Sequence, residues 1–286
     1  RADMHFMLAN LHAPAYTACD PAATLAIPLK LDSDVEATLK RDYLDKVYKS
    51  ICDDLDSAED YLNVETWQPG YNYRFNVISA DALRSRVLLY MGDYEGSLAA
   101  ARRVLAVRSE LSDVSSELPN AYNSVENIVA LEQVMTASYA RTLKVNRDFY
   151  RLYTSADKRR RTYFNQVSAS NILLTKGGSN TYSCTLRTGE MLLNAAEAAW
   201  HCDDREAAEG YLLTLQRARY NDGGAAKEAA VAAMTDDELL TEILEERARE
   251  LAFEGHRWFD LRRTTRPRIV RSYRGEEYVL EANDPR

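Results

Sequence analysis

Two similar stretches of the 286-residue chain constrain its fold more than any other feature. In 77–107, and again in 190–219, apolar side chains recur every three to four residues on both sides of a short turn. Equivalent positions lie 110 residues apart, as Tyr90 and Trp200 do, so the second stretch repeats the first. This spacing predicts amphipathic helices, and helix pairs at a fixed offset are typical of tetratricopeptide-type repeats. We therefore predict two tetratricopeptide-like helix pairs.

The C-terminal region carries the clearest helix boundaries. Thr235 and Glu238 have the spacing of a capping box, which satisfies the first backbone amides of a helix. Gly255 predicts the end of that helix, because glycine enters the left-handed conformation without a Cβ penalty. A short second helix is expected after it. We predict that Gly255, Trp258 and Phe259 are structural, with both aromatic rings packed against the preceding helix.

The rest of the chain has weaker patterns. Further helices are predicted at 1–11 and 42–62, where apolar residues keep helical spacing. Helical periodicity weakens in 108–187, so a loop-rich insertion is expected between the two helix pairs. Within it, 126–132 alternates in part and predicts a short extended segment. The basic run 158–161 stands alone in an acidic chain, and we expect it to pair with acidic faces rather than with nucleic acid.

Composition limits the class of protein. The net charge is −8 and the pI is near 5.2, which argues against a general phosphate-binding surface for DNA or RNA. The hydrophobic content of 46% is ample for a core. The sequence has no run of eighteen apolar residues, so it predicts no membrane-spanning helix.

Four potential acid, base or metal-binding groups lie close together in the C-terminal region. They are Glu250, Glu254, His256 and Asp260. Arginines are interspersed among them, and carboxylates tuned for catalysis need isolation or burial without such partners. We therefore interpret the group as an ion-pair lattice, and we predict no catalytic residue, no cofactor and no bound metal.

The cysteines do not suggest a metal site either. Cys19, Cys52, Cys184 and Cys202 lack the Cys-x-x-Cys spacing of zinc sites. For Cys52 a buried thiol is expected. A Cys184–Cys202 disulfide is possible in an exported protein, and the sequence leaves that pairing open.

The run ERARELAFEGHRWFDLRR, at 246–263, resembles the C-terminal signature of the SusD/RagB family. This is a family of surface glycan-binding lipoproteins from Bacteroidetes nutrient-uptake systems. The resemblance implies an all-α fold with tetratricopeptide-like helix pairs, a loop-rich insertion at 108–187 and a C-terminal signature at 235–286. It implies a single SusD-like domain over 1–286. Since residue 1 opens inside a predicted helix, we expect the chain to start partway through a longer protein.

The resemblance also implies a function. Family members capture glycans at the cell surface for polysaccharide utilisation, and hand them to a SusC-like TonB-dependent transporter of the outer membrane. The implied protein is a non-catalytic surface lipoprotein, held to the membrane only by an N-terminal lipid anchor that this chain does not contain. Two alternatives stay open. One is a helical glycoside hydrolase, which would need two carboxylates roughly 5–10 Å apart across a cleft. The other is a tetratricopeptide-type scaffold that binds a peptide.

A sugar binder needs exposed aromatic rings for stacking and polar side chains for the hydroxyl groups. The chain has 18 tyrosines and 3 tryptophans, many of them in predicted loops beside amides. The candidate ligand contacts are Trp67, Tyr71, Tyr73, Tyr122, Asn123, Tyr163 and Asn165. The alternative for each tyrosine is a partly buried core position.

Overall fold

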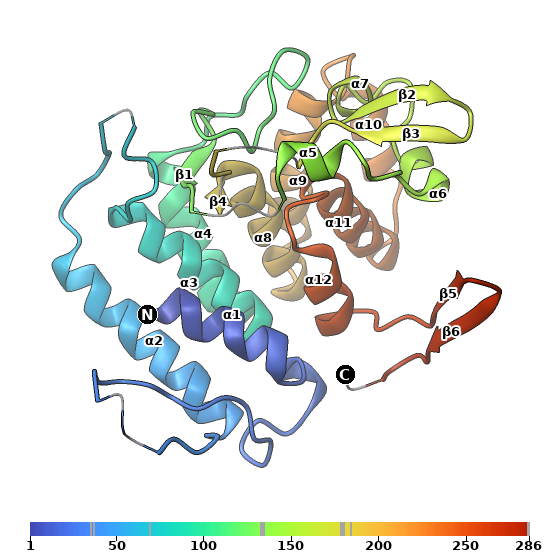
Figure 1. The fold of residues 1–286 in the computed structure, drawn as a ribbon. Helices are drawn as coiled ribbons and strands as arrows, with labels where there is room; N and C mark the ends of the chain where they lie inside the picture. The colour runs from blue at the N-terminus through green and yellow to red at the C-terminus, as the bar shows by residue number, and fades with distance from the viewer. Residues whose placement is uncertain are drawn as a thin grey trace. The chain divides into compact units, whose positions relative to one another are not determined.

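The fold is described from a computed structural model (Figure 1). The structure describes residues 1–34, 36, 38–68, 70–131, 135–177, 181–183 and 185–284. The chain divides into two compact units, each made of segments that are distant in sequence. The terminal unit contains 1–61, 90–93 and 257–286, and the central unit contains 62–89 and 94–256. The single-domain expectation stays a prediction.

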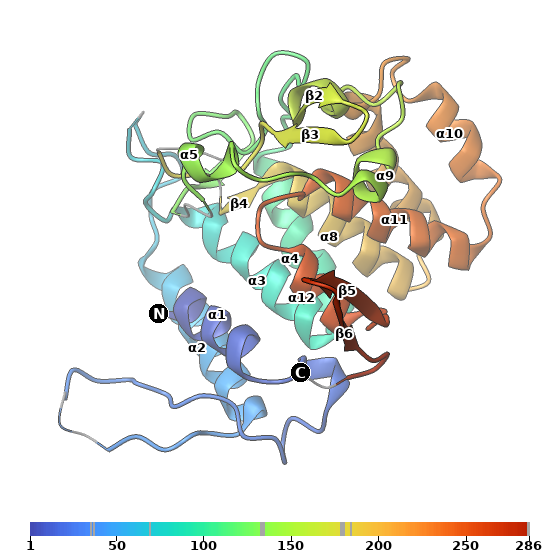
Figure 2. The same ribbon diagram turned by 45° about the vertical axis from the view of Figure 1, so that its right-hand side comes forward.

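The central unit contains both predicted helix pairs. Its longer helices are α3 (Val77–Met91, apart from its last two residues), α4 (Tyr94–Val107), α8 (Thr188–His201), α9 (Arg205–Arg219), α10 (Ala225–Ala232) and α11 (Asp236–Glu250). Helix α8 packs against α4, α9 and α11, and Figure 2 shows it between α4 and α11. The predicted pairs correspond to α3 with α4 and to α8 with α9. That prediction is confirmed.

Small side chains join the two helix pairs. On α8 every residue from 188 to 199 is buried, and four of these are alanines. Short side chains let helix axes approach closely, and hydroxyl groups can then bond across the gap. The Oγ of Ser97 donates to the backbone oxygen of Ser85 at 2.8 Å, and the Nδ2 of Asn194 donates to the Oγ of Ser85 at 3.2 Å. This polar contact links α3, α4 and α8.

The insertion holds the strands of the central unit and several single-turn helices. Strand β1 (Asn127–Val129) pairs antiparallel with β4 (Leu186–Arg187), and β2 (Phe164–Ser168) pairs with β3 (Asn171–Leu174). The short helices are α5 (Ala137–Ala140), α6 (Arg147–Arg151) and α7 (Arg159–Thr162). Strand β1 confirms the predicted extended segment. Helices dominate the described residues and strands form only two-stranded sheets, so the all-α class is confirmed.

Helix α11 begins as its sequence predicts, but it ends at Glu250, with Leu251 as its C-cap, and not at Gly255. Thr235 and Glu238 form both hydrogen bonds of the capping box. Gly255 has φ of +88°, in the left-handed region that favours glycine. A Cβ at this position would have open space around it, with no atom within 4 Å. The requirement for glycine is therefore one of backbone conformation and not of packing.

Gly255→Ala is expected to lower the free energy of unfolding by about 1 kcal/mol, because alanine is strained in the left-handed region. Chemical denaturation measures the change. Gly210→Ala is the matched control, since Gly210 lies inside α9 and also has open space around it. That change is expected to raise the free energy of unfolding by about 0.5–1 kcal/mol. If the free energy of unfolding changed in the same direction in both variants, the argument from backbone conformation would be contradicted.

The terminal unit packs α1 (Ala2–His12) against α2 (Leu44–Tyr61). Phe6 on α1 meets the ring of Tyr48 at 6.2 Å and that of Tyr90 at 5.2 Å, both edge to face. The unit also contains η1 (Tyr16–Ala18), α12 (Arg257–Arg263), β5 (Ile269–Tyr273) and β6 (Glu276–Leu280). Arg262 on α12 donates to the backbone oxygen of Ala13 at 2.6 Å, which ties α12 to the segment after α1. Cys52 on α2 is half-buried rather than buried.

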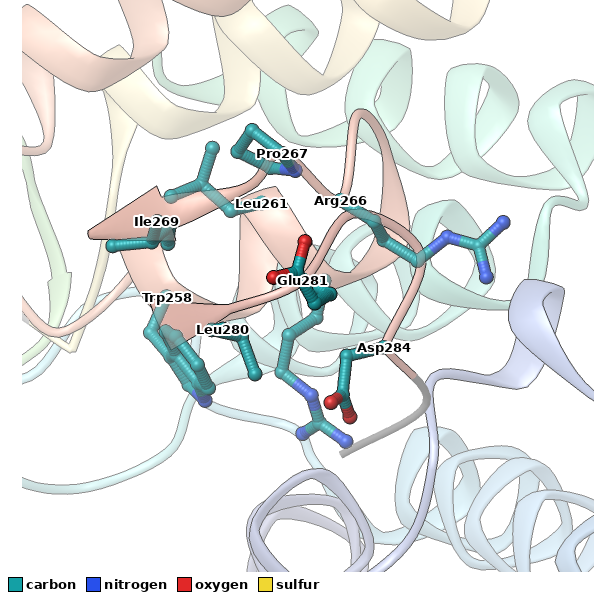
Figure 3. Close-up of a pocket in the computed structure, with 9 residues that line it drawn as sticks. Trp258, Leu261, Arg266, Pro267, Ile269, Leu280, Glu281 and Asp284 are labelled. Carbon is teal, nitrogen blue, oxygen red and sulfur yellow. The ribbon is translucent and has the colours of Figure 1, made fainter. Parts of the chain in front are cut away.

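Trp258 is not buried, whereas the sequence predicted a ring packed against the preceding helix. Its side chain is 45% exposed, and its ring faces Leu280 and Ile269 of the β5–β6 hairpin (Figure 3). The inward position on α12 belongs to Asp260, whose carboxylate accepts from the Nη2 of Arg263 at 2.9 Å. The space beside the ring, about 20 Å³, is close to what one water needs. This hollow is too small for a ligand site. Phe259 is half-buried.

Candidate functional site

An aromatic loop leads into α3. We define it as Trp67, Gln68 and Gly70–Phe75. The guanidinium of Arg74 lies 5.0 Å from the ring centroid of Trp67 and 4.6 Å from that of Tyr71. It lies 5.7 Å from the centroid of Tyr73. A cation over an aromatic face is attracted by the negative potential of that face. Arg74 therefore holds three rings together on one short segment.

Backbone and side-chain hydrogen bonds fix this loop to the segments on either side of β1. The hydroxyl of Tyr122 donates to the backbone oxygen of Gly70 at 2.8 Å. In return, the Nδ2 of Asn72 donates to the backbone oxygen of Tyr122 at 2.7 Å and to the Oδ1 of Asn123 at 3.3 Å. The amide of Ala130 then donates to the backbone oxygen of Asn72 at 2.8 Å. The loop is thus held at both of its sides.

Two rings of the aromatic loop remain open to solvent. Tyr71 is 41% exposed and Tyr73 is 38% exposed, and their centroids lie 6.1 Å apart with planes inclined by 45°. Trp67 is half-buried, and its indole nitrogen donates to the backbone oxygen of Phe75 at 2.8 Å. Trp67 therefore stabilises the loop, and the rings of the two tyrosines form its exposed surface.

The structure brings five of the seven candidate residues together. These are Trp67, Tyr71, Tyr73, Tyr122 and Asn123. Sequence reasoning did not single out Asn72, which stands between Tyr71 and Tyr73, or Arg74, which follows Tyr73. Their signal was the run of alternating aromatic and polar residues. The dipeptide Pro69-Gly70 predicts a turn that presents the neighbouring rings outward, and Pro69 lies outside the described residues.

Tyr163 and Asn165 lie elsewhere. Tyr163 is 0% exposed and belongs to an aromatic core with Tyr150, Tyr153 and Phe164. Its ring has no face for a ligand, so its assignment as a stacking residue is corrected. Asn165 is exposed on β2 and lines a separate cavity, described below.

A buried ion-pair network occupies the centre of the central unit. Its carboxylates are Glu126, Asp157, Glu242, Glu246, Glu250 and Glu254, and its cations are Arg159, Lys176, Arg187, Arg219, Lys227 and Arg249. Glu250 is the hub: its oxygens lie 2.8 Å from Arg159, 2.7 Å from Arg187 and 2.9 Å from Arg219. The ion-pair interpretation is confirmed for Glu250 and Glu254. In the basic run, Arg159 pairs with acidic residues as expected, whereas Lys158 and Arg160 bond to neutral groups.

These contacts set the protonation of the acids. Burial alone would raise the pKa of Glu250, but the positive charges around it, Arg219 foremost, hold the pKa well below its usual range. By the same balance, Glu246 beside Arg159 has its pKa lowered to about 2. The pKa of Glu254 is also lowered to about 2 by its cationic neighbours, against the effect of burial. All three acids are charged at neutral pH.

The sequence profile of the SusD family matches residues 119–285, more than half of the chain. The chain belongs to the SusD family. A SusD superfamily protein from Bacteroides thetaiotaomicron VPI-5482 is 27% identical, with a TM-score of 0.75; the match covers 92% of this chain and 65% of that one. A SusD superfamily protein from Bacteroides fragilis gives a TM-score of 0.80 at 19% identity, over 99% of this chain and 70% of that one.

A third solved structure is described as a SusD-like carbohydrate binding protein from Bacteroides vulgatus ATCC 8482. It matches with a TM-score of 0.73 at 20% identity, over 98% of this chain and 66% of that one. This SusD-family chain thus spans slightly less than two thirds of the Bacteroides thetaiotaomicron and Bacteroides vulgatus proteins. No curated protein matches it.

Other site types were sought in the same SusD-family chain. Among its described residues, no group of three or more histidine, cysteine or acidic side chains could hold a metal ion. Within the same residues, no helix has the length and apolar character needed to cross a membrane. Cys184 lies outside the described residues, and so does its possible disulfide with Cys202.

Proposed function

We propose that this protein binds a glycan without chemically changing it, and that the aromatic loop makes the main contact. The observation that carries the proposal is the pair of exposed, inclined rings of Tyr71 and Tyr73, held by Arg74 and anchored through Tyr122. Membership of the SusD family supports it. So does the similarity to the Bacteroides vulgatus protein, whose description names carbohydrate as its ligand.

The chemistry of the loop fits a sugar ring. A pyranose has C–H bonds on one face and hydroxyl groups around its rim, so it stacks on an aromatic face and bonds to polar neighbours. Tyr71 and Tyr73 supply ring faces, and the exposed Arg74 and Asn123 supply hydrogen-bond donors. A few such contacts correspond to roughly 4–8 kcal/mol, which is binding in the millimolar to micromolar range.

A glycoside hydrolase is the weaker candidate. Glu246, Glu250 and Glu254 are buried, and each is held by arginine or lysine, so their lowered pKa values do not suit a general acid at neutral pH. A peptide-binding scaffold is disfavoured because α8 is covered by α4, α9 and α11 rather than lining an apolar groove. Incubation of each bound glycan with the protein, followed by chromatography, should return the glycan uncleaved.

A glycan-array screen followed by calorimetry tests the proposal. Tyr71→Ala and Tyr73→Ala are each expected to weaken glycan binding about fivefold, because each removes a stacking face worth about 1 kcal/mol. Tyr139→Ala is the matched control, since this exposed tyrosine lies on α5, outside the aromatic loop. The proposal fails if the screen returns no glycan, or if the loop variants bind as the control does.

By membership of the SusD family, we further propose that the protein acts at the cell surface as an outer-membrane lipoprotein. There it would pass glycans to a SusC-like TonB-dependent transporter for nutrient uptake. Co-purification of such a transporter with the full-length protein from outer membranes tests this step. Recovery of the protein without any transporter would count against it.

A further inference from the structure

A cavity of the central unit lies between α6, α7 and β2. Its volume is about 370 Å³, within the range of roughly 300–1,000 Å³ for small-molecule sites. The lining residues are Tyr150, Ser155, Asp157, Arg160, Arg161, Phe164, Asn165 and Gln166. Four of them, Ser155, Arg161, Asn165 and Gln166, are exposed, so the cavity opens to the surface. None of them belongs to the aromatic loop.

The cavity wall carries uncompensated positive charge. Arg160 bonds to neutral groups, through its Nε to the hydroxyl of Tyr150 at 2.9 Å and through its Nη1 to the backbone oxygen of Tyr153 at 3.0 Å. Within the described part of the chain, neither Arg160 nor Arg161 forms an ion pair. The cavity thus holds two arginines without an ion pair in a chain of net charge −8.

The acidic residue of the lining does not cancel this charge. Asp157 is fully buried, and its two carboxylate oxygens accept from the Nε of Arg159 at 2.9 Å and from its Nη2 at 2.8 Å. Arg159 thus occupies both carboxylate oxygens of Asp157. Asp148, on the neighbouring α6, is likewise occupied by Arg151 at 2.9 Å. An anion in the cavity would therefore meet two guanidinium groups and no free carboxylate among these residues.

The remaining polar groups suit sugar hydroxyls. The hydroxyl of Tyr150 donates to the Oε1 of Gln166 at 3.0 Å, which orients that amide. The amide nitrogen of Gln166 then remains as a hydrogen-bond donor. Asn165 adds a second amide and Ser155 a hydroxyl. Guanidinium forks match the planar carboxylate group in shape and charge, and amides bridge adjacent hydroxyls.

We propose that this cavity binds the carboxylate and hydroxyl groups of a uronic acid residue, so that the glycan taken by this protein is acidic. The inference rests on the proposed glycan-binding function and adds a second contact, separate from the aromatic loop. Arg161 supplies the charge-assisted contact, with Arg160 fixed beside it. The amides of Asn165 and Gln166 form hydrogen bonds to the hydroxyl groups of the sugar ring.

Calorimetry with defined oligosaccharides tests the inference. The probes are oligomers of galacturonate, alginate and a glucuronate-containing glycan, each compared with its methyl-esterified, uncharged form. At least one charged oligomer should bind about tenfold more tightly than its ester. Arg161→Gln should remove that preference, because it deletes a hydrogen bond to a charged group. Raised salt concentration should weaken binding of the charged oligomer only.

Arg141→Gln is the matched control, because it removes the same charge from an exposed arginine of the same insertion, outside the cavity lining. It should leave the preference intact. If Arg161→Gln fails to fold, Asn165→Ala provides a second variant, with an expected loss of affinity for the charged oligomer. Binding of neutral glycans with no uronate preference overturns this inference and leaves the proposed function standing. Binding of no glycan at all overturns both.

Discussion

Glu250→Gln is expected to lower the free energy of unfolding by about 3–5 kcal/mol, a large share of the 5–15 kcal/mol typical of a folded protein. Glu250 accepts from three buried arginines, Arg159, Arg187 and Arg219, so loss of its charge leaves three guanidinium groups undercompensated inside the central unit. Urea denaturation followed by circular dichroism, which reports the helices, measures the change.

The matched control is Glu245→Gln, the same chemical change on the same helix. Glu245 is 48% exposed on its side chain, and it lies 3.4 Å from Arg249. Glu245 is half exposed, and Arg249 keeps Glu242 and Glu246 as partners in its absence, so its loss should cost less than about 1 kcal/mol. Equal effects of the two variants would mean that the buried network does not hold the central unit together.

Acid is expected to unfold the central unit over an unusually low pH range. Glu246 and Glu254 have a pKa of about 2 in the folded protein, against an unperturbed value of 4.5. A depressed pKa contributes stability that is fully present above the unfolded value and is lost as the pH falls toward the folded value. The loss should therefore run from about pH 4.5 to about pH 2, on the order of 3 kcal/mol for each carboxylate.

The urea midpoint at pH 7, 5, 4 and 3 tests this expectation. Stability should be nearly constant from pH 7 to 5 and then fall steeply. Glu254→Gln removes one of the titrating groups, so the urea midpoint should decrease less between pH 5 and pH 3. The same change should lower the midpoint at pH 7. A midpoint that stays constant down to pH 3 would contradict the protonation states assigned to the network.

The helices were predictable from the sequence because their signals are local. The capping box at Thr235 depends on a few neighbouring residues and forms as predicted. Gly255 has the left-handed conformation expected of it, but α11 already ends at Glu250. The position of Trp258 was not predictable in the same way. Which face of a two-turn helix points inward depends on what packs there, and Asp260 with Arg263 takes that place.

In the candidate site, too, local features were predictable from the sequence and tertiary contacts were not. The sequence predicted that Trp67, Tyr71 and Tyr73 share a loop. It could not show that Tyr122 closes on Gly70, because those residues are 52 positions apart and the contact depends on the path of the insertion. Tyr163 failed as a candidate for the related reason that an aromatic residue in a loop-rich segment can equally form its core.

The central claim is that a glycan stacks on the aromatic loop. A crystal structure of the protein with a glycan selected by the array tests it most directly. The account predicts a sugar ring within van der Waals distance, roughly 4 Å, of the ring of Tyr71 or Tyr73. A glycan bound elsewhere, with both tyrosine faces uncovered, would contradict it.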